Sequence, residues 1–244
     1  MYVDTLAVRL RPRTPHEVTD LGVRLCQISA RSVYVCYAAV ALPVLTASMM
    51  SFALAIWLPA LVIWWAKPWL DRTILFVLSR AAFGQQTTVG DLWRAQRHVW
   101  WNQLFLTWTL QRLSLWRSLT QPIYQLEGLS FRKAGARVRQ IRRPIVWSAI
   151  MTTQLFAVLE WMLTSAVLSL AYWFALSGRS PGWAALMSGD LTGPLMFAVA
   201  VAYGCAVLFL EPFYVAAGFA AYLTRRTDLE AWDIEQEFRR AFGS

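Results

Sequence analysis

Two carboxylates stand inside long apolar stretches of this sequence. Glu160 is the single charged residue between positions 144 and 178, and Glu211 is the single charged residue between positions 191 and 224. A carboxylate in hydrocarbon is costly unless it is protonated, paired or hydrogen-bonded, so an ionisable residue there is a functional candidate by default. The two glutamates could bind a proton, a cation or a polar headgroup, or their hydrogen bonds could simply hold helices together.

The spacing from the basic flanks predicts that the two glutamates lie at a similar depth. Glu160 follows Arg143 by 17 residues and Glu211 precedes Arg225 by 14 residues. At 1.5 Å per helical residue, these separations are about 25 and 21 Å. On neighbouring antiparallel helices the two carboxyls could share a proton, or one of them could pair with a basic residue. The possible polar and basic partners are Tyr203, Tyr214, Thr152, Thr153, Gln154, Arg72 and Arg80.

Pro212 comes directly after Glu211 and removes one backbone donor, so we expect a kink in that helix. We take Glu160, Glu211, Pro212 and Tyr214 as the intramembrane functional candidates.

The elements that must position these residues are long apolar helices. Residues 32–66, 144–178 and 191–224 are each almost unbroken apolar sequence. A helix over residues 32–66 would be about 52 Å long, against a hydrocarbon core of about 30 Å. We therefore expect two short spans there, with a reversal near Ser48–Ser51. The fold class predicted is an all-α integral membrane protein with about four transmembrane helices in two hairpins, plus interfacial amphipathic helices.

Charge predicts the orientation. Every Lys and Arg except Arg179 falls in segments that would lie on one side of the membrane. Basic residues favour the cytoplasmic side, so we expect a multi-pass membrane protein with both termini in the cytoplasm.

Five segments follow from this reading. They are a cytoplasmic amphipathic segment (1–31), a transmembrane hairpin (32–66), a basic cytoplasmic or interfacial helical region (67–143), a second transmembrane hairpin (144–224) and an amphipathic C-terminal helix (225–244). In the first segment, Thr14, Pro15 and Glu17 form a capping-box pattern that predicts a helix start.

The basic region contains predicted interfacial helices and a basic helix face that has two interpretations. A helix over residues 70–81, ended by Gly84, is predicted to lie at the membrane interface, and residues 91–101 and 104–116 look similar. Further along, a basic helix face is either a stop-transfer flank or a binding surface for anionic lipid headgroups or an acidic partner. Its candidate docking residues are Arg132, Lys133, Arg137, Arg142 and Arg143.

Composition excludes several functions. The net charge of +9 fits the positive-inside rule and anionic headgroups, so we expect no nucleic-acid partner. Cys26, Cys36 and Cys205 form neither a disulfide framework nor a metal motif, and His16 and His98 have no partners at ligand spacing. Phosphate loops and nucleophile motifs are also missing from the sequence. We expect no enzyme activity, cofactor or metal.

The sequence resembles a family of uncharacterised proteobacterial inner-membrane proteins. The resemblance is carried by Leu10–Glu17, by Trp65–Arg72, and above all by EPFYVAAGF from Glu211, RRTDLEAWDIE from Arg225 and FRR from Phe238. The family is encoded near MoxR-type AAA+ ATPases and transglutaminase-like membrane proteins. Relatives continue into an extracytoplasmic region, whereas this sequence stops at Ser244.

The resemblance singles out further residues and a function. The residues are Glu211, Pro212, Tyr214, Arg225, Arg226, Glu230, Trp232 and Asp233. Independently of the resemblance, Thr227–Glu230 form a capping-box pattern that would begin the C-terminal helix. The expected function is a non-enzymatic scaffold that docks partner proteins such as a MoxR-type AAA+ system, with an oligomer as one expected assembly. The alternative is a protein that translocates protons, ions or lipid with Glu160 and Glu211.

Overall fold

The computed structural model describes residues 14–101, 114, 116–127, 131–174 and 193–230. In these residues all regular structure is helical, as predicted. The elements are α1 (Pro15–Ile28), α2 (Ala30–Met50), η2 (Ser51–Ala53), α3 (Leu58–Ala81), α4 (Val89–Arg94), η3 (Arg97–Trp101), α6 (Arg117–Leu126), α7 (Phe131–Arg142), η4 (Arg143–Ile145), α8 (Val146–Phe174) and α10 (Gly193–Glu230).

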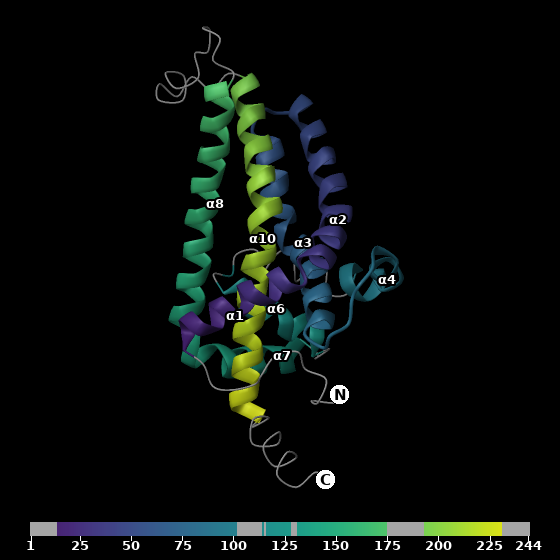
Figure 1. Cartoon of the computed structure of the whole chain (residues 1–244), viewed down its shortest axis with the longest axis vertical. Helices are drawn as coiled ribbons and strands as arrows, with labels where there is room; N and C mark the ends of the chain where they lie inside the picture. The colour runs from purple at the N-terminus through teal and green to yellow at the C-terminus, as the bar shows by residue number, and fades with distance from the viewer. Residues whose placement is uncertain (1–13, 102–113, 115, 128–130, 175–192, 231–244) are drawn as a thin grey trace.

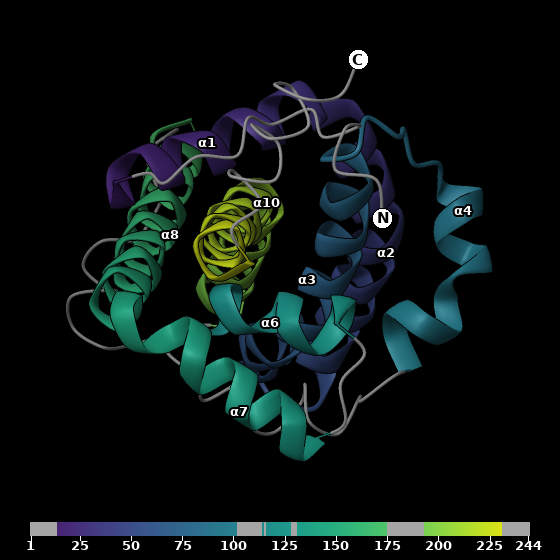
Figure 2. The same cartoon turned by 90° about the horizontal axis from the view of Figure 1, so that it is seen from below.

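Four long helices run along the long axis in two antiparallel pairs (Figure 1). α2 pairs with α3, and α8 pairs with α10. The shorter helices α1, α4, α6 and α7 gather around the lower half of this view, where α1 and α6 pack against α10 from two sides (Figure 2). The lower half is therefore a packed core around α10, while α8 contacts mainly α10.

Three helical stretches are long and apolar enough to cross a membrane: Ala30–Ala53, Ala134–Leu170 and Gly193–Leu229. They contain most of α2, α8 and α10, so an all-α fold with helices long and apolar enough to span a membrane is confirmed. The count among the described residues is three rather than four, because α3 does not qualify. Its charged residues Lys67, Asp71 and Arg72 lower its hydropathy, yet all three are buried inside the protein.

The start of α1 confirms the predicted capping box. The Thr14 hydroxyl accepts a hydrogen bond from the Glu17 backbone N–H, and the Glu17 carboxylate accepts one from the Thr14 N–H. The amphipathic face of α1 packs on α10, burying Val18, Leu25 and Cys26. Gly22 makes this contact possible, because a Cβ there would lie 2.6 Å from the Ala216 carbonyl oxygen.

The first hairpin corrects one predicted boundary. The chain reverses at Ser51–Ala53, close to the predicted position, and α3 then runs unbroken from Leu58 to Ala81. The predicted boundary between residues 66 and 67 thus falls inside a helix, and residues 70–81 do not form a separate interfacial helix. Leu70, Ile74 and Leu78 pack into the core instead of facing lipid, and α3 is followed by Gly84 with φ of 71°, which ends the run as expected.

The last helix corrects a second boundary. α10 continues through Thr227 to Glu230, so the predicted capping box does not begin a new helix at this point. Thr227 is fully buried and its hydroxyl donates to the Leu223 carbonyl within the same helix. Packing of α10 against α1, α6 and α7 therefore extends the helix past the local start signal. The rest of the predicted C-terminal helix lies outside the described residues.

Other predicted segments are described only in part. Of the interfacial stretch 91–101, residues of α4 and η3 are helical, with Trp93 and Trp101 exposed and the Trp100 indole N–H donating to the Thr73 hydroxyl. The predicted helix 104–116 and the loop 177–190 fall almost wholly outside the described residues. A membrane-interface position of the exposed tryptophans stays a prediction.

Candidate functional site

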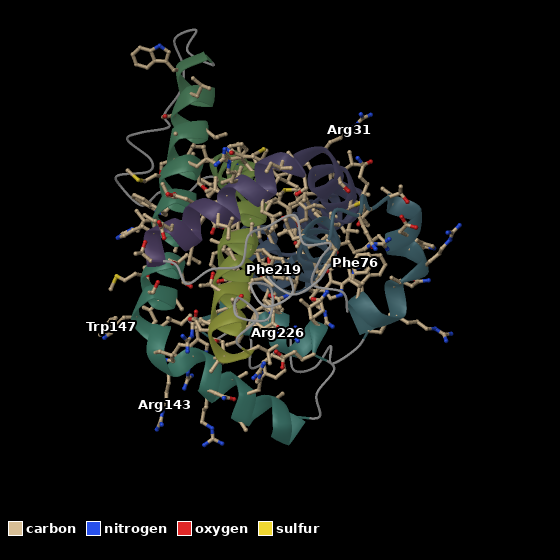
Figure 3. The ribbon with its side chains drawn as sticks, turned by 60° about the horizontal axis from the view of Figure 1, so that its bottom comes forward. Arg31, Phe76, Arg143, Trp147, Phe219 and Arg226 are labelled. Atoms are coloured by element: carbon tan, nitrogen blue, oxygen red, sulfur yellow. The ribbon has the colours of Figure 1, made fainter. Side chains whose placement is uncertain are left out.

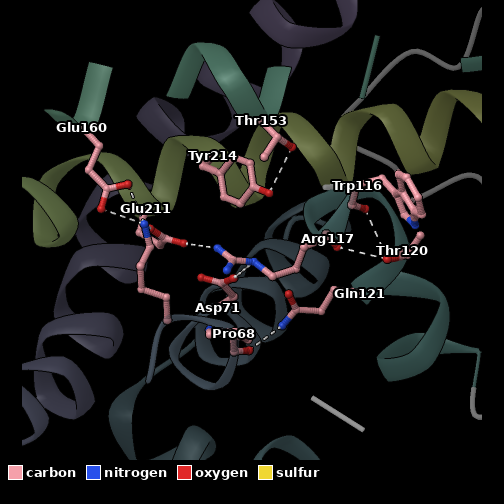
Figure 4. A network of polar contacts seen from close by, with 11 residues as sticks. Pro68, Asp71, Trp116, Arg117, Thr120, Gln121, Thr153, Glu160, Glu211 and Tyr214 are labelled. Carbon is pink, nitrogen blue, oxygen red and sulfur yellow. Dashed lines mark hydrogen bonds and ion pairs between the residues drawn. The ribbon is translucent and has the colours of Figure 1, made fainter. Parts of the chain in front are cut away.

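Five charged side chains from four helices meet at one place (Figure 4). We call them the charge network: Lys67 and Asp71 of α3, Arg117 of α6, Glu160 of α8 and Glu211 of α10. Three of them are carboxylates and two are cations. When all five are ionised, the network carries one surplus negative charge.

Lys67 joins the two glutamates. Its Nζ lies 2.6 Å from Glu160 Oε2 and 2.8 Å from Glu211 Oε2. Two long helices that are adjacent and antiparallel thus present their carboxyls to one ammonium group, which stands on α3. The predicted meeting of Glu160 and Glu211 at a similar depth agrees with this geometry.

Arg117 joins Asp71 to Glu211. Its Nε lies 3.0 Å from Asp71 Oδ2, and its Nη2 donates to Glu211 Oε1 over 2.7 Å. The guanidinium also lies over the ring of Tyr214, 5.2 Å from its centroid, and the Tyr214 hydroxyl is 3.3 Å from the Thr153 hydroxyl. Glu211 is therefore the centre of the network, because it contacts both cations.

The depth of burial differs among the carboxylates. The Asp71 side chain is 0% exposed and that of Glu211 is 3%, whereas the Glu160 side chain is 16% exposed. Buried ions are tolerated only when they are paired with good geometry. Glu160 is the acid that an incoming molecule reaches first.

α6 is held where Arg117 can reach the network. Gly218 of α10 faces Ser118, and a Cβ on Gly218 would lie 2.3 Å from the Ser118 Cβ. On its other side, α6 is tied to α3 because Gln121 donates to the Pro68 carbonyl and Gln125 donates to the Arg72 carbonyl. The close approach of α6 to α10 at Gly218 thus positions Arg117, which precedes Ser118, beside the charge network.

A cavity of about 710 Å³ adjoins the charge network between α3, α8 and α10. Lys67, Arg117, Glu160 and Glu211 form its charged part. Most of the remaining wall is apolar and aromatic, including Trp64, Phe156 and Trp161. Its combination of a large apolar wall with a few convergent polar groups is typical of a ligand site.

The intramembrane candidates predicted from the sequence lie together. Glu160, Glu211 and Tyr214 line the cavity, and Pro212 is buried beside Glu211 in α10. Their charged partners differ from the expected ones: the glutamates bind Lys67 and Arg117 rather than Arg72 or Arg80. Of the expected polar neighbours, Tyr203, Thr153 and Gln154 also line the cavity.

Sequence reasoning missed three members of the network. The sequence places Lys67, Asp71 and Arg117 in the basic cytoplasmic or interfacial helical region 67–143. One signal could have found Lys67 and Asp71, since they stand four residues apart directly after an apolar run and so share a helix face. Arg117 carries no comparable local signal.

Four of the five predicted docking residues whose side chains the structure describes are engaged within the protein. Arg137 pairs with Glu127, Arg225 pairs with Asp228, and the Arg142 guanidinium lies 4.2 Å from the Trp116 ring centroid. Arg226 donates to the Tyr222 hydroxyl, while Arg143 is exposed and points away from the body of the molecule (Figure 3). The side chains of Arg132, Lys133 and Glu230, together with Trp232 and Asp233, lie outside the described residues.

Comparison with known protein families, with curated proteins and with solved structures found no match.

Proposed function

We propose that this protein is a non-enzymatic membrane protein that takes an amphipathic molecule from the bilayer into the cavity beside the charge network. One observation carries the proposal: a cavity lined by both charged and aromatic side chains lies between α3, α8 and α10, of which α8 and α10 are long and apolar enough to span a membrane. An amphipathic molecule matches both parts of the wall, its polar group facing the network and its apolar part facing Trp64, Phe156 and Trp161. This is the binding step that a carrier for lipids or ions requires.

The position of the charge network supports a membrane site. Lys67 is nine residues from the start of α3 at Leu58, which is about 13 Å along a helix and about half of a 30 Å hydrocarbon core. In our proposal, α3 is the fourth span, and its charges face inward. The basic lower end then lies in the cytoplasm of a bacterial cell, with the protein in the inner membrane.

The test compares two tryptophan substitutions on α8. Ala157 lines the cavity, whereas Ala166 is exposed and does not line it. In native mass spectrometry of protein extracted in mild detergent, we expect the wild type and Ala166→Trp to retain a bound small molecule and Ala157→Trp to lose it. A wild type without any bound molecule, or an Ala157→Trp protein with the same one, would overturn the proposal.

The exposed basic residues at the lower end support a second proposal, the docking of an acidic protein partner such as a component of an AAA+ system. Arg139 and Arg143 are exposed on α7 and η4. We expect the double charge reversal Arg139→Glu/Arg143→Glu to release a co-purifying protein, whereas Arg24→Glu, at an exposed position of α1, should retain it. Co-purification that is identical in all three proteins would contradict this docking surface.

A further inference from the structure

The sign of the surplus charge selects the ligand. The charge network holds three carboxylates and two cations, and buried ions in a medium of low dielectric constant are favoured when their charges balance. One proton or one bound cation restores the balance, whereas a bound anion increases the imbalance. The cavity therefore favours a positive group.

The most accessible member of the network is also a carboxylate. Glu160 is 16% exposed, compared with 9% for Lys67 and 7% for Arg117. The ion pair that Glu160 forms among the described residues is with Lys67, and Lys67 keeps Glu211 as a second partner 2.8 Å away. Glu160 can therefore turn to a bound cation without leaving Lys67 unpaired.

Aromatic side chains stand beside this carboxylate. Trp161 follows Glu160 in α8 and is 74% exposed, and Trp64 on the facing helix α3 is 39% exposed. Both line the cavity, together with Phe156 and Tyr214. Cations are attracted to the faces of such rings, most strongly to tryptophan.

The same surroundings argue against a bare metal ion. Within the described residues, no group of three or more His, Cys, Asp or Glu side chains could hold a metal. Lys67 and Arg117 lie among the carboxylates and would repel a metal ion from the centre of the network. A wall of indole and phenyl rings offers a metal ion no ligands but offers an organic cation a large contact area.

We propose that the cavity binds a monovalent organic cation with bulky apolar substituents, with Glu160 as the contacting carboxylate. This inference rests on the proposed function and names the chemical class of its ligand. The tryptophans cover the apolar groups of the cation.

Two probes of the same shape and opposite charge test this inference. Tetraphenylphosphonium is a cation and tetraphenylborate is an anion, so their comparison isolates the sign of the charge. In equilibrium dialysis of the detergent-solubilised full chain, corrected with empty micelles, we expect one phosphonium to bind per chain and the borate not to bind. Glu160→Gln should weaken phosphonium binding about tenfold, equivalent to about 1.4 kcal/mol.

The matched control is Asp20→Asn, which removes one negative charge at an exposed position of α1 and should leave phosphonium binding unchanged. Thermal unfolding of each variant checks that it is folded. Stronger binding of the borate, or equal phosphonium binding by the folded Glu160→Gln protein, would overturn the inference. If the wild type binds neither probe but retains a native small molecule, this inference fails alone; if it retains none, the proposed function fails as well.

Discussion

At the scale of residues, Arg117 is the side chain on which the charge network depends most. It is the cation that pairs with Asp71, which is completely buried, and it also contacts Glu211. Lys67 reaches the two glutamates, so its loss and the loss of Arg117 leave different acids unpaired. An unpaired buried charge is far more costly than a missing pair.

We therefore expect Arg117→Gln to destabilise the protein by about 3–5 kcal/mol, the usual cost of removing one partner from a buried ion pair. Adding Asp71→Asn should recover a large part of this loss, because the orphaned carboxylate is removed as well. Unfolding in detergent, followed by circular dichroism, measures both variants. A double variant that is less stable than Arg117→Gln alone would contradict the pairing.

At the scale of elements, the contact of α6 with α10 depends on Gly218. The Ser118 side chain and backbone occupy the space that a side chain at this position would need. Gly204 lies on the same helix, but a Cβ there would meet Leu45 Cδ2 at an ordinary 3.5 Å. Substitutions at the two glycines therefore distinguish the effect of close packing from the effect of helix propensity.

Gly218→Ala should destabilise the protein by about 1–3 kcal/mol, because α6 must move away from α10. Gly204→Ala should be neutral or stabilise by up to about 1 kcal/mol, since alanine favours a helix interior over glycine. Equal thermal stability of the two variants would contradict the close contact.

The reactivity of the Cys26 thiol reports whether α1 packs on α10. The thiol is completely buried, and burial raises its pKa from 9.0 to about 12. The reactive thiolate is therefore scarce, and reagents cannot reach it. In contrast, Gln27 in the same helix is exposed.

With Cys36 and Cys205 replaced by serine, Cys26 should resist N-ethylmaleimide at pH 7.5 until the protein is denatured. A cysteine at Gln27, with Cys26 also replaced, should react readily. Because the folded state binds the thiol proton more tightly than the unfolded chain, stability from this site is full below pH 9 and is lost as the pH rises towards about 12. Rapid labelling of Cys26 in the folded protein would show that α1 does not pack on α10.

Local signals in the sequence predicted some elements well and others poorly. The capping box at Thr14 depends on neighbouring residues, the reversal near Ser51 follows from the length of the apolar stretch, and the structure has both. The same kind of capping signal failed at Thr227, where packing buries the residue inside α10. Lys67 reads as a basic flank in the sequence, because only tertiary structure places acids from α8 and α10 around it.

At the scale of the whole molecule, the length of α8 is close to the thickness of a bilayer. Trp147 and Trp173 stand near its two ends and are both strongly exposed. They are 26 residues apart, which is about 39 Å along a helix and close to the 40–45 Å of a bilayer with its headgroups. Tryptophans at both ends suit the two interfaces. Glu160 and Trp161 lie near the middle of this distance.

The central claim is that α3 crosses the bilayer with its charges turned inward. Leu54 and Gln86 are exposed positions on either side of α3, so a cysteine at each, in a chain without the native cysteines, reports the crossing. With a membrane-impermeant maleimide and sealed vesicles of both orientations, we predict that Leu54→Cys and Gln86→Cys react from opposite sides. Reaction of both from the same side would place α3 and its charge network outside the membrane and contradict the account.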